Sequence, residues 1–251
     1  MAFPEYPYFF WILAVAAVLV AGISKAGFGG GVGMIATPLM ALAIPVTAAV
    51  GIMLPLLIAC DIFSVYHYRS RFDGWNLRVL LPGAVAGIVA GSLFFGYFSA
   101  NERVLRTCVG GLAIGFVFFQ AARERVFRLL GERKPGKVQG LLLGALSGFS
   151  SMLIHAGGPP AAVHLLPQRM PRDLYVGTTV VLFTSINLIK LIPYSLLGLL
   201  HTGQFWVLAV LAPVAFLGVK LGFYLNRWFS EVWFNRMIHA LLLLTGVRLI
   251  F

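Results

Sequence analysis

Residues 22–34 read Gly22-Ile-Ser-Lys-Ala-Gly-Phe-Gly-Gly-Gly-Val-Gly-Met34, and they interrupt a long apolar run that begins at Tyr8 and ends near Ala43. Each glycine in a helix interior costs about 1 kcal/mol relative to alanine, so this run is poorly suited to one continuous helix. Backbone that leaves the helix at membrane depth is tolerated only where it is buried in protein or lines a watery cavity. The segment therefore predicts a broken transmembrane helix beside a functional cavity, with Lys25 next to the break.

A second interrupted segment, Gly148-Phe-Ser-Ser-Met-Leu-Ile-His-Ala-Gly-Gly-Pro-Pro160, occupies a matching place in the second half of the chain. Two apolar segments that are broken by glycine or proline at corresponding positions are the best sequence indication of a transporter binding site. The two breaks therefore predict one site that is built from both halves.

The composition is that of a membrane protein. Hydrophobic residues make up 60% of the 251 positions and charged residues only 11%, whereas soluble domains carry about 25% charged residues. The mean hydropathy is +0.92. We expect an all-α polytopic membrane protein with about eight transmembrane helices. The net charge of +11 lies mostly in loops, where it indicates orientation in the membrane rather than nucleic-acid binding. The two cysteines lie in apolar segments and predict neither a disulfide nor a metal site, and we expect no cofactor.

An internal repeat is indicated by the order of small residues and prolines. A shift of about 126 residues pairs Ser24 with Ser150 and Pro45 with Pro171. We therefore expect one transmembrane domain over residues 1–251, made of two repeats of four helices. The first repeat would span residues 8–122 and the second residues 138–251, joined by a basic cytoplasmic linker at 123–137. Four crossings per repeat would leave both halves pointing the same way. The alternative is that Met34–Ala43 is an extra crossing or a re-entrant hairpin, which would change the orientation of the second half. The expected spans are Tyr8–Ser24 with a short Met34–Ala43, Val46–Tyr68, Leu77–Phe98, Glu102–Ala122, Val138–Met152 with a short Pro160–Leu166, Leu174–Leu197, Phe205–Leu225 and Val232–Ile250.

Ionisable residues inside membrane spans are functional hypotheses by default. Asp61 and Asn187 occupy corresponding places in the two repeats, and one turn further along the pair is Ser64 and Lys190. Residues three apart share a helix face, so each of these two spans would present a polar stripe to a common cavity. The alternative is that Asp61 forms a buried ion pair with Lys190 or Lys25 that only positions helices.

The glycine breaks offer exposed backbone N–H groups ahead of short helices, and such helix N-termini attract anions. Close helix packing through small residues is the alternative explanation of these glycines. The expected proton-coupling residues are Asp61 and His155, and no catalytic motif of the HExxH, GxSxG, CxxC or phosphate-loop type occurs. The expected substrate-binding residues are Lys25, Gly29, Gly30, Gly31, His155, Gly157, Gly158, Asn187 and Lys190.

The broken first span, with Thr37-Pro38 beyond it, resembles the sulfite exporter TauE/SafE family. The segment Ile44-Pro45-Val-Thr-Ala-Ala-Val-Gly51 and the Gly87-x-x-x-Gly91 pattern of the third span carry the same resemblance, which covers essentially the whole chain. The second break departs from the family's glycine-rich pattern, with His155-Ala-Gly-Gly-Pro-Pro160 in its place. The resemblance implies a bacterial inner-membrane permease of duplicated four-span halves for sulfite, organosulfonates and related small organic anions.

The sequence therefore predicts a secondary transporter, not an enzyme, that moves sulfite, an organosulfonate such as sulfoacetate, or a related carboxylate. Export is the expected direction, proton coupling is a hypothesis, and the bilayer and the anion are the expected partners. A homodimer is a further hypothesis. The alternatives are an anion channel, an intramembrane enzyme that uses His155, His164 and Asp61 on a lipid-linked substrate, and an anchoring module. We expect Lys25→Ala to abolish anion binding and to leave the fold intact.

Overall fold

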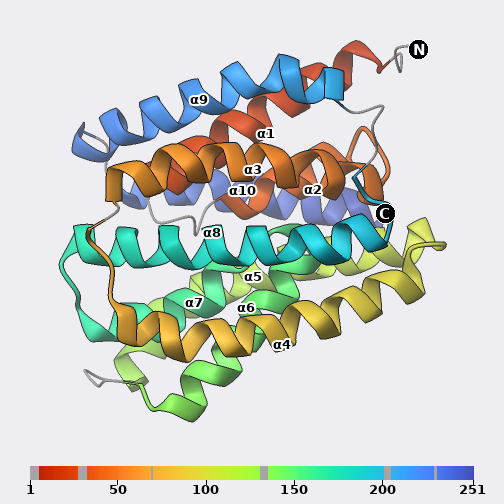
Figure 1. Cartoon of the computed structure of the whole chain (residues 1–251). Helices are drawn as coiled ribbons and strands as arrows, with labels where there is room; N and C mark the ends of the chain where they lie inside the picture. The colour runs from red at the N-terminus through yellow and green to blue at the C-terminus, as the bar shows by residue number, and fades with distance from the viewer. Residues whose placement is uncertain (1–5, 28–32, 69, 131–134, 201–204, 229–230) are drawn as a thin grey trace.

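The computed structural model of the chain describes residues 6–27, 33–68, 70–130, 135–200, 205–228 and 231–251 (Figure 1). Within these ranges the regular structure is helical, which confirms the prediction of an all-α membrane protein. The elements are α1 (Tyr8–Gly27), η1 (Gly33–Ile35), α2 (Ala36–Ala41), α3 (Val46–Tyr68), α4 (Gly74–Phe98), α5 (Glu102–Leu130), α6 (Lys137–Ile154), α7 (Gly158–Leu165), η2 (Leu166–Gln168), α8 (Arg172–Leu196), α9 (Phe205–Trp228) and α10 (Glu231–Ile250).

Seven helices in the described part of the chain, α1, α3, α4, α5, α6, α8 and α9, are long and apolar enough to cross a membrane. The last helix, α10, contributes a shorter apolar stretch, Ile238–Ile250. Two expectations about boundaries change. Residues 123–130 of the expected linker continue α5 as helix, and the second short helix begins at Gly158 rather than Pro160. Pro159 and Pro160 fit there because the first turn of a helix needs no N–H donors.

Two pairs of helices pack in parallel with their backbones in close approach. Gly83 of α4 lies against Leu141 of α6, and Gly87, one turn later, lies against Ala145. A Cβ at Gly83 would lie 2.0 Å from the Leu141 carbonyl oxygen, so no side chain fits between these helices. Helices α1 and α9 pack in the same parallel sense, through the pairs Leu19–Gly218 and Ile23–Gly222.

Two other pairs run antiparallel. Asp61 of α3 bonds to Asn187 of α8, and Tyr68, later in α3, packs against Val180, earlier in α8. Helices α5 and α10 cross in the same antiparallel sense, with Gly246 beside Ile114 and Ile250 beside Gly110. The corresponding helices of the two halves, α1 and α6, α3 and α8, α4 and α9, and α5 and α10, therefore run in opposite directions (Figure 1). The expectation that both halves point the same way is wrong.

The reason lies in the short helices, which turn the chain back instead of adding a crossing. His164 of α7 packs beside Gly140 near the start of α6, and its Nε2 lies 2.9 Å from Asn76 Oδ1 at the start of α4. The α6–α7 hairpin therefore returns to the side from which it entered. Helix α2 has only six residues and leads directly into α3, which runs in the same direction as α1 and α9. Each half thus contains one hairpin and three further crossings, and α1 begins at the same end of the bundle at which α10 ends (Figure 1).

The inverted arrangement also collects the basic residues at one end. We call this end the basic side: α3, α5 and α9 end there, and α4, α6, α8 and α10 begin there. Under the parallel arrangement, Arg169, Arg172 and Arg227 would have faced the other side. The residues of the basic side include Arg71, Arg78, Arg123, Arg125, Arg128, Lys137, Arg169, Arg172, Arg227 and Arg236, whereas the opposite side carries Arg103, Arg106, Arg248 and Glu102.

We expect Gly87→Ala to destabilise the fold by at least about 2 kcal/mol, because overpacking forces packed helices apart. A Cβ at Gly87 would lie 1.9 Å from the Ala145 carbonyl oxygen. The measurement is thermal unfolding of the detergent-purified protein. Gly111→Ala is the matched control, since nothing lies within 4 Å of its Cβ position. Equal melting temperatures for the two variants would contradict the backbone contact between α4 and α6.

Candidate functional site

A buried ion pair and an amide join α1, α3 and α8 at the centre of the bundle. Lys25 Nζ lies 2.5 Å from Asp61 Oδ1, although the geometry is not that of an aligned hydrogen bond, and Lys25 Nζ also donates to the Leu57 carbonyl at 3.2 Å. Asn187 Nδ2 donates to the other carboxylate oxygen, Asp61 Oδ2, at 2.8 Å. Asp61 is completely buried and Lys25 is 5% exposed. Both oxygens of the carboxylate are therefore occupied by groups from the two neighbouring helices.

Lys190 is fully buried on α8, one turn beyond Asn187, and it faces neutral groups. Its Nζ donates to the Ser151 carbonyl and the Ser151 hydroxyl, both at 3.0 Å, and lies 2.7 Å from His155 Nδ1. The His155 Nε2 lies 3.1 Å from the Val50 carbonyl oxygen, which can only accept. Nε2 therefore carries the hydrogen of a neutral imidazole, and Nδ1 accepts from Lys190.

The position of His155 follows from the way in which α6 ends. His155 caps this helix in the left-handed region at φ 57°, and its backbone N–H bonds to the Ser151 carbonyl at 3.0 Å. A residue with a side chain in this region is disfavoured by roughly 1–2 kcal/mol. The turn is held by Ser147 Oγ, which donates to the Gly157 carbonyl at 2.7 Å, and by Ser150 Oγ, which lies 2.9 Å from the Ala156 carbonyl oxygen. These bonds satisfy backbone groups that a broken helix leaves open at membrane depth.

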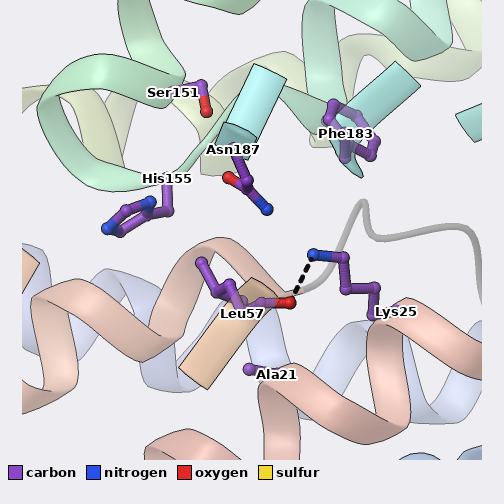
Figure 2. Close-up of a pocket in the computed structure, with 8 residues that line it drawn as sticks. Ala21, Lys25, Leu57, Ser151, His155, Phe183 and Asn187 are labelled. Carbon is purple, nitrogen blue, oxygen red and sulfur yellow. Dashed lines mark hydrogen bonds between the residues drawn. The ribbon is translucent and has the colours of Figure 1, made fainter. Parts of the chain in front are cut away.

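These groups surround a small, partly open cavity of about 30 Å³, shown in Figure 2. A cavity needs about 10–15 Å³ on this measure to hold one water molecule, so there is room for roughly two to three. The lining residues are Ala21, Lys25, Leu57, Ser151, His155, Gly158, Phe183 and Asn187. They come from α1, α3, α6, α7 and α8, so both halves of the chain and both broken segments contribute to the wall.

The charges around the cavity do not balance among the described residues. Asp61 neutralises Lys25, and the groups that contact Lys190 are a carbonyl, a hydroxyl and an imidazole. A protonated Lys190 therefore leaves one buried positive charge without an acidic partner among its described contacts. Burying an uncompensated charge is unfavourable, and an anion in the cavity would relieve this cost.

The structure brings five of the predicted substrate-binding residues, Lys25, His155, Gly158, Asn187 and Lys190, to one place. Lys190 itself stands behind the wall, bonded to Ser151 and His155. Gly157 does not line the cavity; a Cβ there would meet Ser147 Oγ at 2.8 Å, so packing explains this glycine. Gly29, Gly30 and Gly31 lie outside the described residues.

His164 lies away from this site. It is fully buried near the basic side, where Asn76 contacts it and Trp75 stacks on its ring. The enzyme hypothesis required His164 beside His155 and Asp61, and the structure does not place it there. Ser151, Leu57 and Phe183 belong to the wall but were not among the predicted site residues. Ser151 could have been found as a polar residue in the second break, but Leu57 and Phe183 look like ordinary core residues of apolar spans.

The family model described as sulfite exporter TauE/SafE matches residues 14–249, nearly the whole chain. The chain belongs to the TauE/SafE family. The resemblance drawn from the sequence is confirmed, and this member of the TauE/SafE family is a multi-pass membrane transporter. No curated protein and no solved structure matched the chain.

Proposed function

We propose that this TauE/SafE protein is a secondary transporter of a small oxyanion, namely sulfite, an organosulfonate or a related carboxylate. The observation that carries the proposal is a fully buried lysine, Lys190, beside the cavity, with only neutral acceptors among its described contacts, so that its protonated form lacks a counter-charge there. Alternating access places a substrate site near the membrane centre, between repeats and at broken helices. The site between α1, α3, α6, α7 and α8 fits this description, because both halves and both broken segments contribute residues to it.

The bound anion would interact mainly with side chains of the wall. The Asn187 amide has a second N–H beyond the one given to Asp61, and the Ser151 hydroxyl can donate while it accepts from Lys190. The backbone N–H of Gly158 is the first of α7 and precedes two prolines, which have none. Lys190 acts from behind Ser151 and His155. At an effective dielectric constant of 20, a unit charge 4–6 Å away still attracts an anion by roughly 3–4 kcal/mol.

Proton coupling would act through the ion pair of Lys25 with Asp61 and through the hydrogen bond between Lys190 and His155. Asp61 can take a proton only if Lys25 or Asn187 gives up a carboxylate oxygen. His155 can take a proton on Nδ1 only if Lys190 withdraws or loses its own. Protonation at either residue thus changes which cation faces the cavity, which links proton binding to anion binding. The basic side would face the cytoplasm of a bacterium by the positive-inside rule, and export would then run from that side.

The test is transport of radiolabelled sulfite by purified protein in liposomes, with sulfoacetate, lactate and phosphate as competitors. We expect saturable sulfite uptake that is accelerated when unlabelled sulfite is loaded on the opposite face, because only a carrier exchanges substrate across the membrane. An imposed pH gradient should change the rate if protons are coupled.

Protein-free liposomes control for leak. Flux that does not saturate and shows no exchange acceleration would replace the carrier by the anion-channel alternative. No sulfite flux above that of protein-free liposomes, with no flux of labelled sulfoacetate or lactate in the same assay, would contradict the proposal. The homodimer stays a prediction, which cross-linking in the same liposomes would test.

A further inference from the structure

Two apolar side chains line the cavity at equivalent places in the two halves. Leu57 of α3 and Phe183 of α8 are 126 residues apart, the same shift that relates Asp61 to Asn187. Each stands four residues before the polar residue of its helix, so each shares a helix face with it. Both are 8% exposed. Each half therefore contributes one large apolar side chain to the cavity wall.

Because the halves are inverted, the two side chains flank the polar centre from opposite directions. Helix α8 begins on the basic side, so Phe183 lies on that side of Asn187, about one helical turn away. Helix α3 begins on the other side, so Leu57 lies there relative to Asp61. Figure 2 shows Phe183 at the upper right and Leu57 below the centre, with the Asn187 side chain at a height between them.

The Phe183 ring is held against the start of α7. A Cβ at Gly157 would meet its Cε1 at 3.2 Å, so the missing side chain lets the ring approach the turn that carries Gly158. With the ring in the wall, the cavity volume is about 30 Å³, comparable to roughly two to three water molecules, so that any substituent on a bound anion competes with the ring for space.

We propose that Phe183, with Leu57 opposite it, sets the size limit of the anion site, so that the site takes a compact oxyanion such as sulfite and rejects sulfonates that carry a carbon substituent. This inference rests on the proposed function and narrows its substrate class. Phe183 is the specificity-determining residue on the basic side, because its aromatic ring occupies the volume that a substituent would need.

The experiment measures the affinities of sulfite and methanesulfonate for detergent-purified protein by their effect on thermal stability at one fixed pH. We expect the wild type to bind sulfite at least about tenfold more tightly, the scale that one extra carbon produces in an apolar pocket. Phe183→Ala should lower this sulfite-to-methanesulfonate ratio by about tenfold while sulfite binding persists. Using the change in the ratio cancels the difference in charge between the two anions.

Leu188→Ala is the matched control, since it trims a large side chain of the same helix that is 49% exposed. Phe183→Leu is the second variant if the alanine protein does not fold, and it should lower the ratio in the same direction. An unchanged ratio in the folded Phe183 variants, or equal affinities in the wild type, would overturn the size limit while leaving sulfite transport in place. Failure of every protein to bind either anion would overturn the proposed function as well.

Discussion

Asp61→Asn should lower the free energy of unfolding by about 3–5 kcal/mol, the loss that follows when one partner of a buried ion pair is removed. Asp61 is completely buried and is the counter-charge of Lys25. Without it, the Lys25 ammonium would have only the Leu57 carbonyl among its contacts in the described structure, with Lys190 as a second buried cation nearby. The measurement is thermal unfolding of the purified protein in detergent, at a pH near 7 and without added anion.

The double variant Lys25→Met with Asp61→Asn is the control, because it removes both charges of the pair. We expect it to recover most of the stability lost in Asp61→Asn, as coupled neighbours do in a double-mutant cycle. If the stability lost in the double variant equalled the sum of the losses in the two single variants, the ion pair would be contradicted. The pair also revises one expectation from the sequence: Lys25→Ala should now destabilise the protein, because it leaves the Asp61 carboxylate without its cation.

Lys190→Met should show the opposite pattern, with a large loss of sulfite affinity and little change in the free energy of unfolding. The ligand-free protein should keep or exceed its wild-type stability, because an ammonium without an acidic partner among its described contacts is replaced by an apolar chain of similar length. Sulfite affinity should fall by roughly a hundredfold to a thousandfold, which corresponds to the loss of a charge attraction of roughly 3–4 kcal/mol. The two measurements are thermal unfolding without anion and its shift with increasing sulfite.

Lys220→Met serves as the matched control, since it makes the same substitution at an exposed position of α9. It should leave the sulfite response unchanged. If Lys190→Met unfolded the protein while Lys220→Met did not, Lys190 would be a structural residue, and the unbalanced charge would lose its role in the proposed site.

The sequence predicts the helices well because long apolar runs and glycine breaks are local signals. It also predicts the polar stripes: the equivalence of Asp61 and Asn187 under the repeat shift places both on the central helices, where they bond to each other. Lys25 and His155 could be singled out because an ionisable residue beside a break is unusual in an apolar span.

What could not be predicted depends on contacts between distant segments. Hydropathy does not show whether a short apolar helix crosses or returns. The signal for the direction of the second half was the set of loop arginines, Arg169, Arg172 and Arg227, which the parallel arrangement would have placed on the side opposite the other basic loops. The tautomer of His155 is fixed by the backbone carbonyl of Val50. Every residue has such a carbonyl, so the sequence does not reveal which one His155 contacts. Phe183 and Leu57 differ from core residues only by what they face.

The parallel packing of α1 on α9, and of α6 on α4, has a consequence for how the protein is made. Each of these pairs joins a helix of one half to a helix of the other. The partner of Gly22 is Gly218, about 200 residues later in the chain. A ribosome needs about 10–40 s to synthesise the segment between them. During that interval α1 resides in the membrane with its glycine face unmatched. The glycine face of α1 is therefore covered only when α9 arrives, and a chain truncated after the first half would lack the partners of four of its own helices, α1, α3, α4 and α5.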